Sequence, residues 1–184
     1  NGSTYQVAPN LFWEIGYDVI TINNLPNGKN INKNCGAVNI NELSKKVIFE
    51  NADIGFAFDG DGDRMIAVDE KGMEIDGDNL IALFAYNLKK SKKLNKNTVV
   101  STVMSNLGFE KYLKNKLGIK LVRKDVGDIN VISEMQKNKY NLGGEQSGHI
   151  ILGEYMSTGD GILASLKITE MLSNQNLKAS KLFN

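Results

Sequence analysis

Two patterns of hydrophobic and polar positions alternate along the chain and predict an α/β fold. Stretches of roughly 10–15 residues carry apolar side chains at helical spacing, and shorter apolar or alternating runs between them are typical of strands. The helical pattern covers residues 7–16, 40–51, 79–90, 107–117, 129–138 and 161–173. The strand pattern covers residues 17–23, 52–58, 64–69, 97–103, 119–123, 140–143 and 149–152. This alternation predicts layers of helices on a largely parallel sheet.

The pattern divides into two series near residue 75. EKGMEIDG at 70–77 resembles a hinge, and a second strand and helix series follows it. We therefore predict two tandem three-layer α/β domains with mixed, mostly parallel sheets, over residues 1–74 and 75–184. Residues 24–39 are too rich in Asn and Gly for regular structure and are expected to form a loop.

The ends of the chain indicate an internal piece of a longer protein. The sequence opens with NGSTYQ, without an initiating methionine, and closes with LKASKLFN inside another helical pattern. The first predicted domain is expected to lack its first strand, which would leave a sheet edge exposed.

Composition and charge narrow the class of protein. The 184 residues carry a net charge of +1, so no basic field favours nucleic acid or an anionic membrane. The single cysteine, Cys35, excludes an internal disulfide and is typical of a reducing compartment. The sequence has no apolar run near the ~20 residues that span a bilayer. A cytoplasmic protein is expected.

The candidate chemistry begins at FAFDGDGDRMIAVD, residues 56–69. Asp59, Asp61 and Asp63 alternate with glycines between two apolar strands, and Arg64 follows directly. Three carboxylates this close repel one another, and each loses free energy where water is partly excluded. A positive partner is therefore expected.

Three other interpretations of these aspartates fit less well. A plain Asp-Gly turn explains two solvent-facing carboxylates, but not three of them with an arginine after a buried strand. An EF-hand calcium loop needs glycine at its sixth position, where this chain has Arg64, and helices on both sides. A phosphatase of the haloacid dehalogenase type, with Asp59 as nucleophile, remains the enzymatic alternative, although Asp63 stands where that chemistry expects Thr or Val.

A magnesium site explains the pattern best. In an extended loop, side chains at alternate positions point the same way, so the three carboxylates can converge on one cation. Three anionic oxygens suit a hard divalent ion that keeps open positions for water or phosphate oxygens. A metal beside an arginine indicates phosphoryl transfer.

The dipeptide Gly-Asp recurs just before three of the predicted helices. Asp78, Asp128 and Asp160 are expected to act as N-caps, accepting hydrogen bonds from unpaired backbone N–H groups. Asp128 is also a candidate to face a ligand, because helix N-termini gather at the binding edge of α/β sheets.

Taken together, three motifs resemble those of the alpha-D-phosphohexomutases. They are DGDGDR (59–64), GGEQSGH (143–149) and TGDG (158–161). PNGKNINKNCG (26–36) and MSNLG (104–108) are similar to one subgroup, the bacterial phosphoglucosamine mutases. The resemblance covers the whole chain and implies most of domain II and all of domain III of a four-domain enzyme.

The resemblance also implies an activity and its residues. Enzymes of this subgroup convert glucosamine 6-phosphate to glucosamine 1-phosphate through a phosphoserine and a bisphosphate intermediate. By position, Asp59, Asp61 and Asp63 would bind Mg²⁺, and Arg64 would hold the transferring phosphoryl group. The resemblance further implies that the substrate contacts are Glu145, Ser147 and His149, the only histidine in the chain.

The resemblance leaves other points open. Ile129 and Asp125 stand where relatives often have basic residues, so Lys124 or Arg123 would have to steer a phosphosugar instead. The phosphoserine motif of domain I and the phosphate-binding loop of domain IV do not occur here, so this chain alone should not turn over. The functional alternatives are a phosphomannomutase or phosphoglucomutase of the same family, or a non-catalytic metal or sugar-phosphate binding module.

Overall fold

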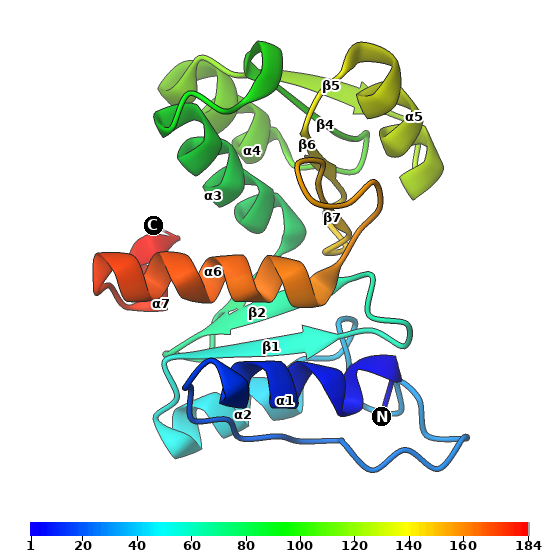
Figure 1. The fold of residues 1–184 in the computed structure, drawn as a ribbon, viewed down its shortest axis with the longest axis vertical. Helices are drawn as coiled ribbons and strands as arrows, with labels where there is room; N and C mark the ends of the chain where they lie inside the picture. Colours follow the sequence, from blue (N-terminus) through cyan, green and yellow to red (C-terminus); the bar gives the residue numbers. More distant parts are fainter. Residues whose placement is uncertain (184) are drawn as a thin grey trace. The chain divides into compact units, whose positions relative to one another are not determined.

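The computed structural model describes residues 1–183, which form two compact units (Figure 1). The first unit comprises Asn1–Ile75 together with Gly161–Leu182, and the second comprises Asp76–Asp160 with Phe183. The helix that begins at Gly161 therefore belongs with the first unit. Asn184, the last residue of the second predicted domain, lies outside the described residues.

The first unit is built on a small antiparallel sheet. Its strands are β1 (Ile54–Phe58), β2 (Met65–Asp69) and β3 (Glu74–Ile75), in the order β1-β2-β3. Ala57 pairs with Ile66, and Phe58 pairs with Met65. The helical elements of this unit are η1 (Ser3–Tyr5), α1 (Val7–Glu14), α2 (Asn41–Glu50), α6 (Gly161–Gln175) and α7 (Ala179–Leu182).

Helices cover both faces of this sheet. In Figure 1, α1 and α2 lie on one side of β1 and β2, and α6 lies on the other. All five residues of β2 are buried, which explains why MIAV is an uninterrupted apolar run and does not alternate. Phe12 of α1 stacks on Phe56 of β1 with ring centroids 5.9 Å apart. The predicted three-layer arrangement is confirmed in this unit.

The prediction of a strand at 17–23 is wrong for this structure. These residues form no strand, although YDVITIN alternates as a strand should. The reason is the lack of a partner: residues 17–24 and β1 line the same hollow of about 780 Å³, and β1 pairs only with β2. An extended segment without a neighbouring ladder leaves its backbone groups to water.

The second unit contains a four-stranded mixed sheet. Its strands are β4 (Thr98–Thr102), β5 (Lys120–Lys124), β6 (Leu142–Gly144) and β7 (Ile150–Leu152), in the order β5-β4-β6-β7. β4 runs parallel to β5 and β6, and only β7 is antiparallel to its neighbour. The mostly parallel sheet predicted from the sequence is confirmed here, whereas the strands of the first unit are antiparallel.

This second sheet also lies between two layers of helices. The helical elements are α3 (Gly77–Lys90), η2 (Asn95–Asn97), α4 (Leu107–Lys111), η3 (Tyr112–Lys116) and α5 (Asp128–Asn138). In Figure 1, α3 and α4 lie on one side of the strands and α5 on the other. Val131 and Met135 of α5 pack on Val100 and Ile151 of the sheet. The three-layer prediction is confirmed in this unit too.

The helix boundaries correct three finer predictions. The N-cap of α3 is Asp76, whose side chain accepts a hydrogen bond from Asn79 N, so Asp78 lies within the helix. Similarly, Gly127 precedes α5 and Asp128 is its first residue. The predicted helix 107–117 is α4 followed by one turn of π-helix, η3. Among the described helices, none is both long and apolar enough to cross a membrane.

Glu70 links the short helix α7 to the turn after β2. Its carboxylate accepts a hydrogen bond from Ser180 N at 2.9 Å and a second from the Ser180 hydroxyl. Partial burial alone would raise the pKa of Glu70, but the two hydrogen bonds from Ser180 outweigh it and lower the pKa. The ionised carboxylate therefore favours the folded state.

This linkage predicts a pH dependence of stability. A depressed folded-state pKa contributes stability above the ordinary glutamate pKa and loses it as the pH falls through the folded value. Glu70→Gln should therefore lower the free energy of unfolding at pH 7, and the difference from wild type should shrink toward about pH 3. Urea unfolding at both pH values measures this difference in the free energy of unfolding between wild type and Glu70→Gln. An equal difference at both would contradict this account.

Candidate functional site

The aspartate motif forms the turn between β1 and β2. Asp59 directly follows β1, and its Oδ1 accepts hydrogen bonds from Gly62 N at 3.1 Å and Arg64 N at 3.2 Å. One carboxylate oxygen thus satisfies two backbone donors and closes the turn. Gly62 has a φ of +82°, a conformation that a residue without Cβ adopts easily.

The three carboxylates of this turn converge. Asp59, Asp61 and Asp63 each offer a ligand oxygen, and these oxygens lie within 4.8 Å of one another. Asp61 is exposed, whereas the other two are half-buried. Burial raises the pKa of Asp59, the hydrogen bond from Arg64 N lowers it, and the neighbouring Asp63 and Asp61 carboxylates raise it again. The group therefore has the charge and donor chemistry of a divalent-cation site.

Arg64 supplies a positive charge beside this group. Its Nε lies 3.9 Å from Asp59 Oδ2 and 3.9 Å from Asp63 Oδ1. Within the described residues this buried Nε has no hydrogen-bond partner. The side chain is 43% exposed, so part of the guanidinium faces solvent. A planar cation in this position suits the oxygens of a phosphate group.

The first residue of α6 lies against the same turn. Gly161 N donates a hydrogen bond to Gly62 O at 3.0 Å. A Cβ at Gly161 would lie 2.9 Å from Gly62 O and 3.0 Å from Arg64 O, so a larger residue would push the turn away. Sequence reasoning did not identify Gly161 as a functional residue, although it lies in the TGDG motif, which could have indicated it.

The GGEQSGH motif forms the turn between β6 and β7 in the second unit. Glu145 N donates to His149 O at 2.9 Å, and Gly148 N donates to Glu145 O at 3.0 Å. The Glu145 side chain is buried, and its Oε1 accepts a hydrogen bond from Gly127 N at 3.1 Å. Glu145 is thereby fixed in position at the start of α5.

Gly77 allows α3 to begin directly against this turn. Its N–H donates to Gln146 O at 3.0 Å. A Cβ at Gly77 would lie 2.2 Å from Glu145 O, a distance that no side chain tolerates. Sequence reasoning identified Gly77 as part of a hinge and of a Gly-Asp pair before a helix, but not its contact with this turn, because the partner lies far along the chain.

Ser147 and His149 occupy different environments in this turn. Ser147 is exposed, as a substrate contact would require. His149 is 1% exposed, and its Nε2 accepts a hydrogen bond from Gly159 N at 3.1 Å. Of the three predicted sugar contacts, Ser147 faces solvent, while Glu145 and His149 are largely covered.

The two basic residues considered for phosphosugar steering are engaged within the second unit. The Arg123 guanidinium donates to Glu110 and to two backbone carbonyls. Lys124 Nζ lies 3.3 Å from Glu134 Oε2. Both side chains therefore already have anionic or carbonyl partners.

Comparison with family models identifies the class of protein. Residues 1–72 match phosphoglucomutase/phosphomannomutase alpha/beta/alpha domain II, and residues 76–184 match alpha/beta/alpha domain III. The chain belongs to the phosphoglucomutase/phosphomannomutase family.

The similar curated sequences are phosphoglucosamine mutases. The chain is 50% identical to that of Bartonella bacilliformis over 182 residues, which are 99% of this chain and 40% of the relative. It is 51% identical to that of Zymomonas mobilis over 184 residues, covering all of this chain and 41% of the relative. The chain thus spans about two fifths of the length of these relatives.

Solved structures share the fold at lower identity. A phosphoglucomutase/phosphomannomutase family protein from Burkholderia thailandensis matches with a TM-score of 0.84 and 24% identity, over 98% of this chain and 40% of that one. The N-acetylphosphoglucosamine mutase of Aspergillus fumigatus, in complex with GlcNAc-6P and magnesium, matches with a TM-score of 0.72 and 18% identity, over 96% and 46% of the two chains.

The hydrogen bonds of the turn predict that Asp59 and Asp61 differ in their effect on stability. Asp59→Ala leaves two backbone N–H groups without their acceptor and should lower the free energy of unfolding by about 1–3 kcal/mol. Asp61→Ala removes an exposed carboxylate from a repulsive group and should change it by less than about 0.5 kcal/mol. Urea unfolding without divalent metal measures both. Equal losses would show that Asp59 does not hold the turn.

Proposed function

We propose that the chain is the metal-loop and sugar-loop portion of a phosphoglucosamine mutase that interconverts glucosamine 6-phosphate and glucosamine 1-phosphate. The observation that carries the proposal is the convergent Asp59, Asp61 and Asp63 group beside Arg64. The 50–51% identity to phosphoglucosamine mutases over essentially the whole chain supports this substrate over other hexose phosphates.

The donor set of the β1–β2 turn fits Mg²⁺. Three carboxylate oxygens lie close together, and the pKa of Asp59 is raised by burial and by its acidic neighbours, so a cation would relieve the repulsion. Asp59, Asp61 and Asp63 would hold the ion. When bound, Mg²⁺ would offset negative charge on a phosphoryl group during its transfer.

The proposed reaction moves a phosphoryl group between two oxygens of one sugar. A phosphoserine in domain I donates its phosphoryl group to the free hydroxyl of the substrate, which gives a hexose bisphosphate. The other phosphate then returns to the serine, so serine and sugar exchange phosphoryl groups without net loss. Domains I and IV of the longer protein, the latter with a phosphate-binding loop, are the partners that this scheme requires.

Arg64 has the catalytic role in this scheme. The exposed part of its guanidinium would donate hydrogen bonds to the oxygens of the transferring phosphoryl group, where charge accumulates. The Asp59 and Asp63 carboxylates, each 3.9 Å from Nε, attract the guanidinium electrostatically. Lysine could not donate the same hydrogen bonds to the phosphoryl oxygens, because it lacks the planar fork.

The β6–β7 turn has the sugar-binding role. Ser147 presents an exposed hydroxyl, and Glu145 presents a carboxylate held by Gly127 N through Oε1. A carboxylate and a hydroxyl at i and i+2 can bind adjacent sugar hydroxyls. His149 would contribute to the same substrate site, since its buried ring accepts a hydrogen bond from Gly159 N and so orders the chain there.

The same proposal includes the domain boundaries, with domain II at 1–74 and domain III at 75–184. It also includes the absence of the first strand from domain II. We propose that an extended segment of the longer protein lies in the hollow beside β1. β1 pairs on one edge only, and residues 17–24 line the same hollow. Phe12 and Val47 supply apolar lining. A strand placed there would pair with β1 and with residues 17–23, which would then have a hydrogen-bonded neighbour.

The metal assignment predicts the behaviour of Asp61→Ala in the full-length enzyme. The variant should bind Mg²⁺ much more weakly and lose about 100-fold or more in kcat, the scale of losing a charge-stabilising group. Asp53→Ala, at an exposed aspartate just before β1, is the matched control and should behave as wild type. Calorimetric titration with Mg²⁺ and a coupled assay on glucosamine 6-phosphate measure both. Undiminished turnover by Asp61→Ala would overturn the metal site.

The added strand predicts a difference in hydrogen exchange. Amides of residues 17–23 and of β1 should exchange more slowly in the full-length protein than in the 184-residue chain, because a strand pairs with them only there. Amides of β2, already paired on both sides, are the internal control and should be similarly protected in both. Identical exchange at 17–23 in the two proteins would contradict the added strand.

A further inference from the structure

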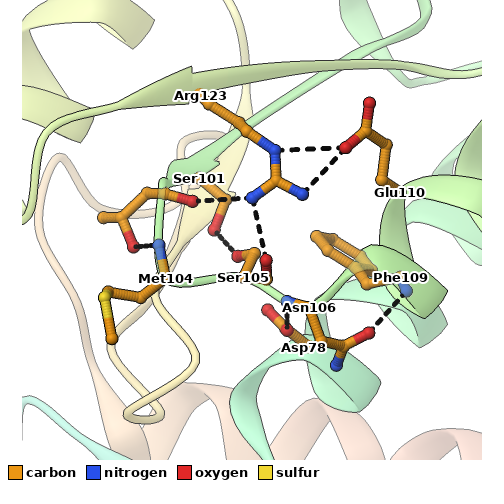
Figure 2. Close-up of polar contacts among 9 residues, drawn as sticks. Asp78, Ser101, Met104, Ser105, Asn106, Phe109, Glu110 and Arg123 are labelled. Atoms are coloured by element: carbon orange, nitrogen blue, oxygen red, sulfur yellow. Dashed lines mark hydrogen bonds and ion pairs between the residues drawn. The ribbon is translucent and has the colours of Figure 1, made fainter.

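A polar network in the second unit underlies the loop that follows β4 (Figure 2). Arg123 on β5 is its centre. Its Nη1 donates to Ser105 O at 2.8 Å and to Thr102 O at 3.3 Å. Its Nε and Nη2 both donate to Glu110 Oε2, at 3.2 and 2.8 Å. One guanidinium thus fixes both ends of the loop after β4 and the first turn of α4.

Asp78 of α3 holds the same loop from another direction. The side chain is 1% exposed, and its Oδ2 accepts a hydrogen bond from Asn106 N at 2.7 Å. Asn106 in turn caps α4, since its Oδ1 accepts from Phe109 N at 2.7 Å. Figure 2 shows Asp78 and Arg123 contacting neighbouring residues of one short segment. This explains why an acidic residue is buried inside the first turn of α3.

The network continues from this loop to the turn that carries Glu145. Ser101, at 0% exposure, donates its hydroxyl to Gly144 O at 2.7 Å, and its Oγ lies 2.6 Å from Ser105 Oγ. Since a hydroxyl has one proton to donate, a Ser101 hydroxyl that donates to Gly144 O accepts from Ser105 in this pair. A continuous path therefore runs from Arg123 through Ser105 and Ser101 to the peptide that precedes Glu145.

The position of Gly144 makes this contact matter for Glu145. Gly144 ends β6 with a φ of +156°, and a Cβ there would lie 2.4 Å from His149 O, so the backbone leaves no room for a side chain at this residue. Its carbonyl belongs to the peptide whose N–H is that of Glu145. Holding that carbonyl sets the peptide plane, and the peptide plane sets the direction in which the Glu145 side chain leaves the backbone.

We propose that Ser101 is a positioning residue for the sugar-binding turn, with Arg123 and Ser105 holding Ser101 in place. This inference rests on the proposed function, because it assigns Ser101 a role that acts through Glu145. Ser101 does not contact substrate, since it is fully buried in β4, an interior strand of the sheet. It fixes the Gly144–Glu145 peptide, while Gly127 N fixes the carboxylate itself.

The test is Ser101→Ala in the full-length enzyme. The variant leaves Gly144 O without its donor and should lower kcat/KM for glucosamine 6-phosphate by about tenfold. Mg²⁺ affinity should stay at the wild-type value, because the aspartate turn lies in the other unit. Ser165→Ala is the matched control: Ser165 is also fully buried, and its hydroxyl donates to a backbone carbonyl, Ile162 O, at 2.8 Å. This control should keep the wild-type kcat/KM.

A double-mutant cycle separates positioning from general destabilisation. Glu145→Gln alone should reduce kcat/KM strongly, and adding Ser101→Ala should then cost less than about twofold more, because the residue through which Ser101 acts is already altered. If Ser101→Ala costs the same factor in both backgrounds, or lowers Mg²⁺ affinity as well, Ser101 has only a structural role and the proposal is overturned.

The outcomes also distinguish this inference from the proposed function. If the wild-type enzyme does not convert glucosamine 6-phosphate, the proposed function fails before any variant is compared. If the wild type turns over and Glu145→Gln is impaired while Ser101→Ala is not, the proposed function stands and only the positioning role of Ser101 fails. Arg123→Lys, which keeps the charge but loses the fork, should reproduce part of the Ser101→Ala loss.

Discussion

The concentration of like charge in the β1–β2 turn is the constraint on which the first unit depends. Three carboxylates in a six-residue connection repel one another, and the turn persists because Asp59 Oδ1 accepts hydrogen bonds from both Gly62 N and Arg64 N. β2 begins immediately afterwards and is buried along its whole length, so the chain cannot move to separate the charges. The repulsion is retained in the folded state, and it is the physical basis of the cation site proposed for this turn.

The sequence allows this turn to be predicted because every signal for it is local. The apolar runs on either side are long enough to identify two strands, and the alternation of Asp with Gly identifies the turn and its chemistry together. Residues 17–23 carry an equally clear alternating pattern and yet form no strand. The difference is that a strand needs a neighbour, and the sequence of one segment does not state whether its neighbour is present.

The residues that support the proposed sugar-binding turn between β6 and β7 are harder to predict for the same reason. Glu145 and Ser147 stand out in a glycine-rich motif, but nothing near Ser101 or Arg123 in the sequence indicates that they act on that motif. Their partners lie 43 residues away at Gly144 and 18 residues away at Ser105. Asp78 was expected to be an N-cap, and the structure shows Asp76 in that role instead. Two acceptors compete for one helix start, and the tertiary contact with Asn106 N decides between them.

Close backbone approach explains why the TGDG segment is so restricted. Gly159 belongs to the second unit, where a Cβ would lie 2.6 Å from the His149 ring. Gly161 belongs to the first unit, where a Cβ would lie 2.9 Å from Gly62 O. Each glycine is thus required by a different functional turn, although only one residue separates them. Because both requirements are steric and both partners are distant in sequence, periodicity and propensity cannot reveal them. Glycines that carry no reactive side chain can therefore be as restricted in sequence as the carboxylates of the turns that they contact.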